Sequence, residues 1–397
     1  MFTTRPELVG TFGMVSSTHW LASSAGMAML EKGGNAFDAA VAAGMVLQVA
    51  EPHLNGPGGD LPLILHRTGS EKMEVICGQG PAPAGATLKH YKNLGLDLVP
   101  GTGLLATVIP GAFYAWMMML RDHGTLSLAE VFEPALHYAS QGIPVLERIQ
   151  KTISYVQQLF REEWSSSAEI FLPGNEVPEV NQLLCNPVLA KTWSRIIRES
   201  EAVSGSRENQ IDQARKTFYQ GFVAEAMEHF CLNEEVLDNS GRKHKGVLNG
   251  QDLAGWEATY EAPLTYHYAG LEIGKCGPWS QGPVQLQTLA LLNEMGVADW
   301  NPVSTDFIHG VTEALKLAFA DREAYYGDPD FVKVPLKRLL SREYNRERSK
   351  EISDRASLEL RPGKISGFEV RMPEFDSSGR GDERFSAMGI GEPPVSK

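Results

Sequence analysis

The sequence predicts a layered α+β fold, and two kinds of segment support this prediction. Long stretches carry apolar residues at helical spacing, which predicts several amphipathic helices. Two pairs of short β-prone runs, each separated by turn residues, predict hairpins. A chain that mixes hairpins with many helices buries its apolar faces by packing layers together. With 397 residues, 43% of them hydrophobic, the chain can build a sizeable core.

The first two helices are predicted from their ends. A helix over residues 21–32 is followed by Gly33-Gly34, which suits the left-handed geometry after a helix C-terminus. A second helix over residues 36–49 ends before Pro52, and its many alanines and glycines allow close approach to a neighbour. Helical patterns also predict helices over residues 111–123, 127–141, 147–162, about 219–232, 284–294 and 306–326.

The strands are predicted as two hairpins. The first joins residues 62–66 to residues 73–77, and the second joins residues 264–268 to residues 271–275 through Ala269-Gly270. Three segments are expected to be irregular because they are rich in glycine and proline: residues 55–60, 78–85 and 277–283.

Domain organisation follows from composition. No linker interrupts residues 1–364, so they are predicted to form one body. Residues 365–397 shift to Gly, Pro, Ser and charged residues and are predicted to form a polar tail. A disordered terminus without any role is the alternative interpretation of this tail.

The charge balance excludes several classes of protein. A formal net charge of -13 disfavours nucleic acid and anionic membranes as partners.

The first twenty residues lack the charged and apolar regions of a signal peptide, and no apolar run is long enough to span a bilayer. The four cysteines show no zinc or disulfide spacing. A reduced, cytoplasmic, globular protein is the expectation, with processing upstream of the sequence left open.

Common catalytic motifs are missing from the sequence. The nearest approach to a serine-hydrolase elbow, Pro278-Trp-Ser-Gln-Gly282, lacks the first glycine. No His-Glu-x-x-His or phosphate-binding Gly-x-x-x-x-Gly-Lys-Ser/Thr occurs. Gly101-Thr-Gly-Leu-Leu-Ala106 imitates a dinucleotide fingerprint, but Pro110-Gly111 breaks the helix that such a loop must open. Neither a metal nor an organic cofactor is predicted.

A series of short blocks resembles one enzyme family. They include Gly327-Asp-Pro-Asp-Phe-Val-Lys-Val-Pro335, Leu30-Glu-Lys-Gly-Gly-Asn-Ala-Phe-Asp-Ala-Ala40, Glu51-Pro-His-Leu-Asn-Gly-Pro-Gly-Gly59, Ala82-Pro-Ala84, His123-Gly-Thr-Leu126, Gly277-Pro-Trp-Ser-Gln-Gly282 and Leu360-Arg-Pro-Gly363. Their order and spacing over residues 10–364 resemble the large subunit of γ-glutamyltransferases and the related acylases of the N-terminal-nucleophile (Ntn) hydrolases.

This resemblance implies a fold and a mechanism. The implied fold is a four-layer αββα sandwich, completed by a separate small subunit from the same self-cleaving precursor. The residue at the new N-terminus of the small subunit, usually threonine, becomes the nucleophile, and its own amino group acts as the base. No catalytic residue is therefore assigned in this chain. The polar tail, residues 365–397, would lead to the processing point.

The sequence departs from the γ-glutamyl-specific members at one position. In those members, an arginine before the Ala-Pro-Ala block binds the donor's α-carboxylate. This sequence has Gln79 at that position, with Gly78 and Gly80 beside it. A neutral amide cannot replace two charge-assisted hydrogen bonds. Substrate binding at these three residues is the favoured interpretation, with room for a different acyl group. The alternative is that Gln79 bonds nearby backbone.

A second candidate substrate-binding segment is Trp279-Ser280-Gln281. The resemblance places this loop near the substrate, where the indole could form an apolar wall for an acyl chain. Simple packing is an equal alternative. The carboxylates Asp328 and Asp330 are predicted to shape a turn, and Asp38 and Asp321 to form ion pairs, the latter with Arg322.

The sequence therefore predicts the large subunit of a self-processed acylase or amidohydrolase that works through an acyl-enzyme. Its predicted partners are the small subunit and a small amide substrate, and a dimer of such heterodimers is compatible with the resemblance. Water or an amine could accept the acyl group. Two alternatives stay open: a true γ-glutamyltransferase or glutathione hydrolase, and a non-catalytic scaffold that retains the fold.

Overall fold

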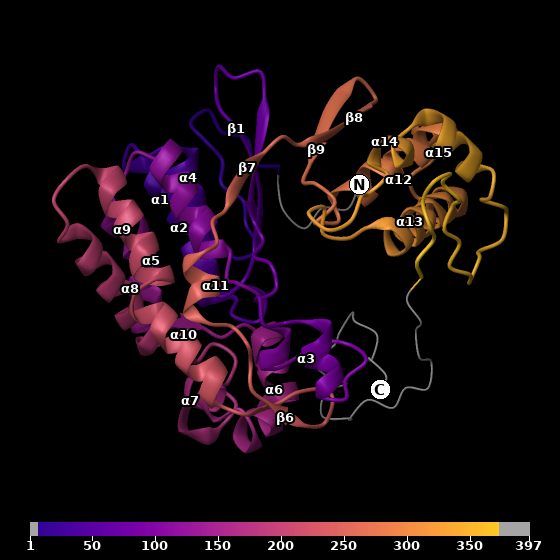
Figure 1. The fold of residues 1–397 in the computed structure, drawn as a ribbon. Coiled ribbons are helices and arrows are strands. Elements are labelled where there is room, and N and C mark those ends of the chain that lie inside the picture. The colour runs from indigo at the N-terminus through magenta and orange to yellow at the C-terminus, as the bar shows by residue number, and fades with distance from the viewer. Residues whose placement is uncertain (1–6, 373–397) are drawn as a thin grey trace. The chain divides into compact units, whose positions relative to one another are not determined.

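The computed structural model describes residues 7–372, which form two compact units. Unit 1 holds residues 7–61 and 78–258, and unit 2 holds residues 62–77 and 259–372 (Figure 1). The chain mixes helices and strands, in agreement with the predicted α+β class. The single body over residues 1–364 stays a prediction, and residues 373–397 of the predicted tail lie outside the described residues.

Unit 1 is mainly helical. Its helices are α1 (Trp20–Glu31), α2 (Ala36–Ala50), α3 (Leu88–Asn93), α4 (Ala112–His123), α5 (Leu128–Gln141), α6 (Glu147–Glu162), α7 (Ser165–Phe171), α8 (Pro187–Glu201), α9 (Arg207–Tyr219), α10 (Phe222–Asn233) and α11 (Gly250–Ala254). Two short antiparallel pairs complete it: β3 (Ile143–Pro144) with β4 (Leu183–Leu184), and β5 (Val236–Leu237) with β6 (Lys243–His244).

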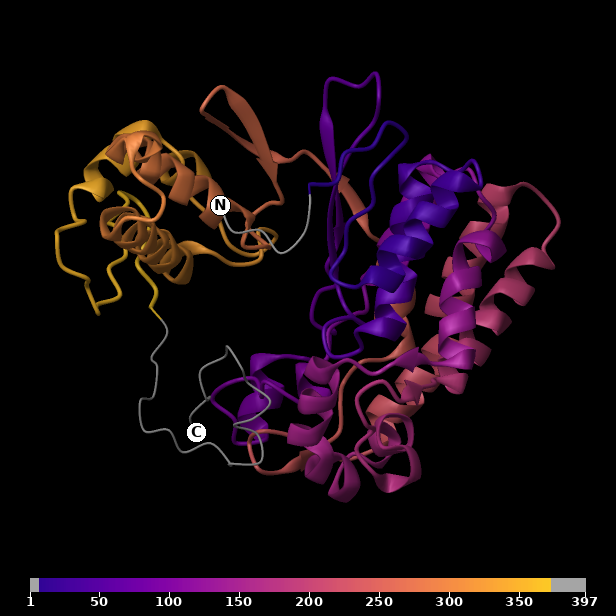
Figure 2. The same ribbon diagram turned by 180° about the vertical axis from the view of Figure 1, so that it is seen from behind.

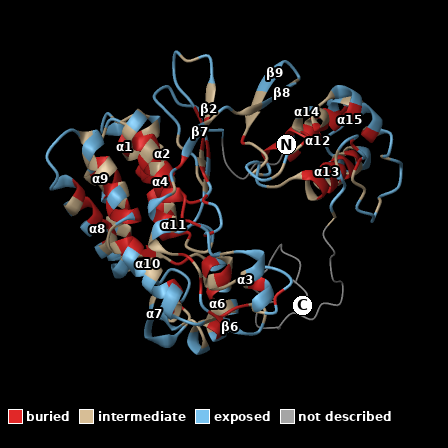
Figure 3. Cartoon of the chain, viewed as in Figure 1, coloured by how far each residue is buried: buried red, intermediate tan, exposed pale blue. Residues whose placement is uncertain are grey.

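The alanine-rich helix α2 lies in the middle of unit 1. It packs against α1, α4 and α5, and further contacts link α4 to α9 and α5 to α8, as Figures 1 and 2 show from opposite sides. A Cβ on Gly44 would lie 2.4 Å from the Trp116 ring, so the predicted close approach at this helix is confirmed. The helix faces turned toward one another are the buried ones (Figure 3).

Capping residues define where these helices begin and end. Gly33 adopts φ +92° after α1, which confirms the predicted left-handed stop. Asn35 and Asp38 form a reciprocal capping box at the start of α2. The buried Asp38 carboxylate also accepts backbone N–H bonds from Thr125 and Leu126, so it ties the turn before α5 to α2. Its role is structural, as the sequence predicted, although its partners are N–H groups and a hydroxyl rather than a cation.

Unit 2 contains most of the larger sheet, although Leu61 and Gly78, at the ends of two of its strands, are counted in unit 1. Strands β1 (Leu61–His66), β2 (Met73–Gly78) and β7 (Thr259–Glu261) form a sheet in that order. Strand β7 pairs antiparallel with β2, with Ile76 opposite Tyr260. The second predicted hairpin is confirmed as β8 (Leu264–Tyr268) and β9 (Leu271–Lys275), and Ala269 and Gly270 both take positive φ in its turn.

The rest of unit 2 is a helical cluster. Helix α12 (Gly282–Met295) packs against α13 (Thr305–Tyr325) and α15 (Arg342–Ser349), and α14 (Leu336–Leu339) precedes α15. Ile365 is buried against the α13–α15 region, and the Arg371 backbone donates to the Ala324 carbonyl. The packed chain thus continues beyond the predicted start of the tail. None of the helices in the described part of the chain has the length and apolarity that crossing a bilayer requires.

Candidate functional site

The loop after β2 interlocks with the start of α4. A Cβ on Gly80 would lie 1.9 Å from the Ile109 carbonyl oxygen, and one on Gly111 would lie 1.9 Å from the Gly78 carbonyl oxygen. Only glycine fits at such distances from backbone atoms. The Ile109 N–H also donates to the Pro81 carbonyl at 3.0 Å. Residues 78–81 are therefore held rigidly on residues 109–111.

The glycine-rich loop 55–60 caps the same helix. Gly111 supplies no side-chain cap for α4, but the Gly59 carbonyl accepts from the Gly111 and Ala112 N–H groups at 3.0 and 2.9 Å. The buried Tyr219 hydroxyl accepts from the Tyr114 N–H at 3.1 Å and donates to the Pro110 carbonyl at 2.6 Å. These bonds satisfy first-turn donors that would otherwise lack partners. The predicted irregular segment thus has a structural function.

Gln79 lies between two buried glycines and is itself exposed. Its side chain makes no hydrogen bond with any described residue, so its amide is available to another molecule. The backbone on either side is fixed by the contacts of Gly78 and Gly80. This loop therefore presents one neutral polar side chain from a rigid support.

The second candidate segment forms a tight turn at the start of α12. The Ser280 hydroxyl donates to the Gly277 carbonyl and accepts from the Gly282 N–H. The Trp279 indole N–H donates to a Glu261 carboxylate oxygen at 2.8 Å, which fixes the half-buried ring against β7. Gln281 is the N-cap residue of α12, and it is exposed and gives no side-chain cap.

The structure thus brings the six predicted residues together in two groups of three. Gly78, Gln79 and Gly80 belong to unit 1, and Trp279, Ser280 and Gln281 belong to unit 2. Sequence reasoning missed the side chains that support them. Tyr219 and Glu261 follow no local motif, and only the fold places them beside these loops.

The aspartates of the family blocks serve structural roles. The Asp328 carboxylate accepts a hydrogen bond from the Asp330 N–H. The Asp328 backbone carbonyl accepts hydrogen bonds from the Phe331 and Val332 N–H groups, as expected for a turn. The buried Asp321 accepts from Gln287, Tyr344 and the Gly363 N–H.

The predicted partner of Asp321 was wrong. Its cation is Arg348, at 3.3 Å, whereas Arg322 lies near Glu323. The correct partner is 27 residues away in the sequence, so adjacency along the chain was misleading.

The buried cysteines give no sign of activation. Burial raises the pKa of the Cys231 and Cys276 thiols, which disfavours the reactive thiolate. Within residues 7–372, no group of three or more His, Cys, Asp or Glu side chains is arranged to hold a metal ion.

Comparison with known proteins identifies the family. The family model described as gamma-glutamyltranspeptidase matches residues 22–379. The chain therefore belongs to the gamma-glutamyltranspeptidase family.

Two curated relatives are proenzymes. The chain is 32% identical to the glutathione hydrolase-like YwrD proenzyme of Bacillus subtilis, over 87% of this chain and 61% of that protein. It is 33% identical to the acylase ACY 1 proenzyme of Pseudomonas sp. strain SE83, over 85% of this chain and 58% of that protein. The chain thus spans about three fifths of the length of these relatives.

Solved structures of two proteins also resemble this chain. The structure of LmbA2991HD is 53% identical, with a TM-score of 0.88, and the match covers 94% of this chain and 63% of that one. The gamma-glutamyltranspeptidase of Helicobacter pylori is 28% identical, with a TM-score of 0.78, and the match covers 90% of this chain and 97% of that chain.

Proposed function

We propose that this chain is the large subunit of a self-processed amidohydrolase or acylase with an uncharged acyl specificity. The amide would be attacked by the N-terminal nucleophile of a small subunit, giving an acyl-enzyme that water resolves. Family membership supports the reaction class, and Gln79 supports the acyl specificity. The predicted cytoplasmic location belongs to the same proposal.

Two observations support the small subunit. The match covers 97% of the Helicobacter pylori structure's chain but only about three fifths of the two proenzymes. In the described residues, β1 and β7 each have one strand neighbour, and Ile64 on β1 and Leu271 on β9 expose apolar side chains. Unpaired strand edges invite further strands. A small subunit that pairs there would complete the predicted four-layer sandwich.

The acyl specificity rests on the observation that the loop presents Gln79 where the resemblance implies an arginine. Leaving a substrate carboxylate poorly paired in a dry pocket costs on the order of a few kcal/mol, about two decades in specificity. An uncharged acyl group carries no such cost. The two buried glycines hold the loop in place without adding side chains beside the amide.

A true γ-glutamyl hydrolase is the second candidate. It requires a cation from another segment to take the carboxylate. A non-catalytic scaffold is the third, and it requires that the complete gene lack the nucleophile.

Processing tests the first part of the proposal. The complete gene product is expressed, and its fragments are measured by intact mass and N-terminal sequencing. We expect two fragments, the smaller beginning with Thr, Ser or Cys, and loss of cleavage when that residue is replaced by alanine. A single uncleaved chain, or a small fragment that begins with another residue, would support the scaffold instead.

A further inference from the structure

Unit 1 contains a cavity between α6 and the segment that follows α2. It has a volume of about 700 Å³ and is bounded by residues 52–54, by α6 and by Trp164 and Phe171. None of the six predicted site residues lines it. Its volume falls in the usual range for small-molecule sites, about 300–1,000 Å³.

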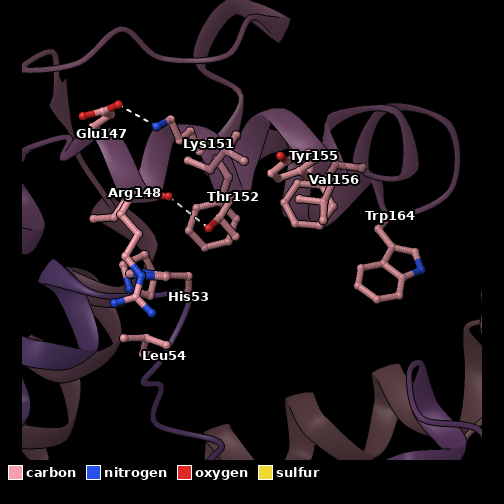
Figure 4. Close-up of a pocket in the computed structure, with 14 residues that line it drawn as sticks. His53, Leu54, Glu147, Arg148, Lys151, Thr152, Tyr155, Val156 and Trp164 are labelled. Carbon is pink, nitrogen blue, oxygen red and sulfur yellow. Dashed lines mark hydrogen bonds and ion pairs between the residues drawn. The ribbon is translucent and has the colours of Figure 1, made fainter. Parts of the chain in front are cut away.

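One end of the cavity carries positive charge without a partner. Arg148 on α6 makes no side-chain hydrogen bond or ion pair with any described residue, whereas the neighbouring Lys151 is paired with Glu147 at 2.6 Å. Figure 4 shows Arg148 beside His53 at this end. Both ring nitrogens of His53 are buried without a hydrogen-bond partner.

The state of His53 fits an anion at this end. Burial lowers the pKa of His53, and the Arg148 charge lowers it further, while Glu51 acts in the opposite direction. The imidazole is therefore neutral at pH 7, and Arg148 is the charged side chain without an ion-pair partner among the described residues that line the cavity. Arg148 is exposed, so an incoming oxyanion would replace water on its guanidinium with a charge-assisted hydrogen bond.

The other end of the cavity is aromatic. It is lined by Tyr155, Phe160, Trp164 and Phe171. The rings of Phe160 and Trp164 are stacked with centroids 6.1 Å apart, and the Trp164 indole N–H donates to the Leu237 carbonyl at 3.0 Å. That bond fixes the orientation of the indole. The cavity thus joins a fixed aromatic wall to a free cation.

We propose that this cavity binds a small aromatic carboxylate, with the carboxylate on Arg148 and the ring against Trp164 and its aromatic neighbours. The single guanidinium selects an anion, and the aromatic wall selects a flat apolar body. This site is independent of the acyl group proposed for the Gln79 loop.

Calorimetry on the complete gene product tests this site with 2-naphthoate and its uncharged analogue, 2-naphthalenemethanol. We expect naphthoate to bind one per chain, about tenfold more tightly than the alcohol, because one charge-assisted bond is worth roughly that factor. Equal affinity for the two probes, or no binding of naphthoate, would overturn the proposal.

Variants locate the probe. Arg148→Met should weaken naphthoate about tenfold and leave the alcohol unchanged, because only the charged contact is lost. The matched control is Arg198→Met on α8, an exposed arginine whose side chain has no partner among the described residues, and it should leave both affinities unchanged. An unchanged naphthoate affinity in a folded Arg148→Met protein would contradict the site.

A filling variant gives a second route that does not depend on Arg148. Val156→Trp places a large ring in the cavity and should abolish binding of both probes. Gln79→Met, in the other loop, adds no charge and should not change naphthoate affinity. Retained binding in Val156→Trp, or altered binding in Gln79→Met, would place the probe elsewhere.

Discussion

Gln79 is the residue on which the substrate assignment depends. Its side chain is exposed and unbonded among the described residues, and its backbone is fixed by glycines that tolerate no Cβ. The resemblance to the family singled it out, because alignment on the Ala82-Pro-Ala84 block sets its position; without the resemblance a structural role was the favoured interpretation. The contacts of Gly80 with Ile109 could not be predicted, since they join segments about thirty residues apart.

Gln79→Arg should allow the loop to bind the carboxylate of a γ-glutamyl substrate. We expect kcat/KM for a γ-glutamyl anilide, relative to an uncharged acyl anilide, to rise about a hundredfold, because two charge-assisted bonds replace a neutral contact. Steady-state kinetics on the processed protein measures this ratio. Gln79→Met, which changes shape without adding charge, is the control and should not raise it. A ratio that stays constant in the arginine variant would argue against contact between this position and the substrate.

Gly80→Ala should destabilise the protein. Its Cβ would meet the Ile109 carbonyl at 1.9 Å, so the backbone must shift, at a cost of about 1–3 kcal/mol or more. Gly56→Ala is the matched control, because a Cβ there meets nothing within 4 Å, and it should change stability by less than about 0.5 kcal/mol. Thermal unfolding compares the two. Equal midpoints would contradict the interlocked loop.

At the level of elements, the sequence predicted those with strong local signals. The second hairpin, α6 and the long α13 appear with ends within one or two residues of the prediction. Helices α8 and α9 were missed. Helix α9 is strongly polar, and contacts with α4 and α8 stabilise it. Helix α8 does carry a local signal, because Trp193, Ile196 and Ile197 lie at helical spacing after the Asn186 cap, and the prediction overlooked it.

The buried Asp321 joins α12, α13, α15 and the Arg361–Gly363 segment. Asp321→Asn should therefore cost about 1–3 kcal/mol, because the buried Arg348 loses one of its two carboxylate partners and keeps only Glu351. Asp330→Asn, at an exposed carboxylate of the nearby turn, should be close to neutral. Chemical denaturation of both variants checks this. Similar unfolding free energies would show that the Asp321 network contributes little.

For the whole molecule, acid should reduce stability through the buried His19. Burial lowers the pKa of His19 below its ordinary value of 6.5 in the folded state. The unfolded chain then takes up the proton first, so stability is present above about pH 6.5 and is lost as the pH falls.

His19→Asn keeps a side chain that can cap α1 and should reduce the loss of thermal stability between pH 8 and pH 5. His267→Asn, at an exposed histidine, should leave that loss unchanged. A pH dependence identical to that of the unaltered protein in both variants would show that His19 does not contribute.

For the whole molecule, the sequence was sufficient to predict the family but carried little information about the assembly. The ordered blocks were sufficient for the gamma-glutamyltranspeptidase family, as the match over residues 22–379 confirms. The small subunit, the acyl group and the cavity on α6 depend on contacts between distant segments or on another chain. Periodicity and motif spacing carry no information about such contacts.

We propose that the active protein cleaves amides of uncharged acyl groups in preference to γ-glutamyl amides. The most direct measurement is kcat/KM of the processed gene product for a γ-glutamyl anilide beside anilides of aliphatic and aromatic acids. We predict that at least one uncharged anilide is cleaved about a hundredfold more efficiently. Efficient cleavage of the γ-glutamyl anilide alone would contradict the claim and identify a γ-glutamyl hydrolase whose carboxylate grip comes from a residue other than Gln79.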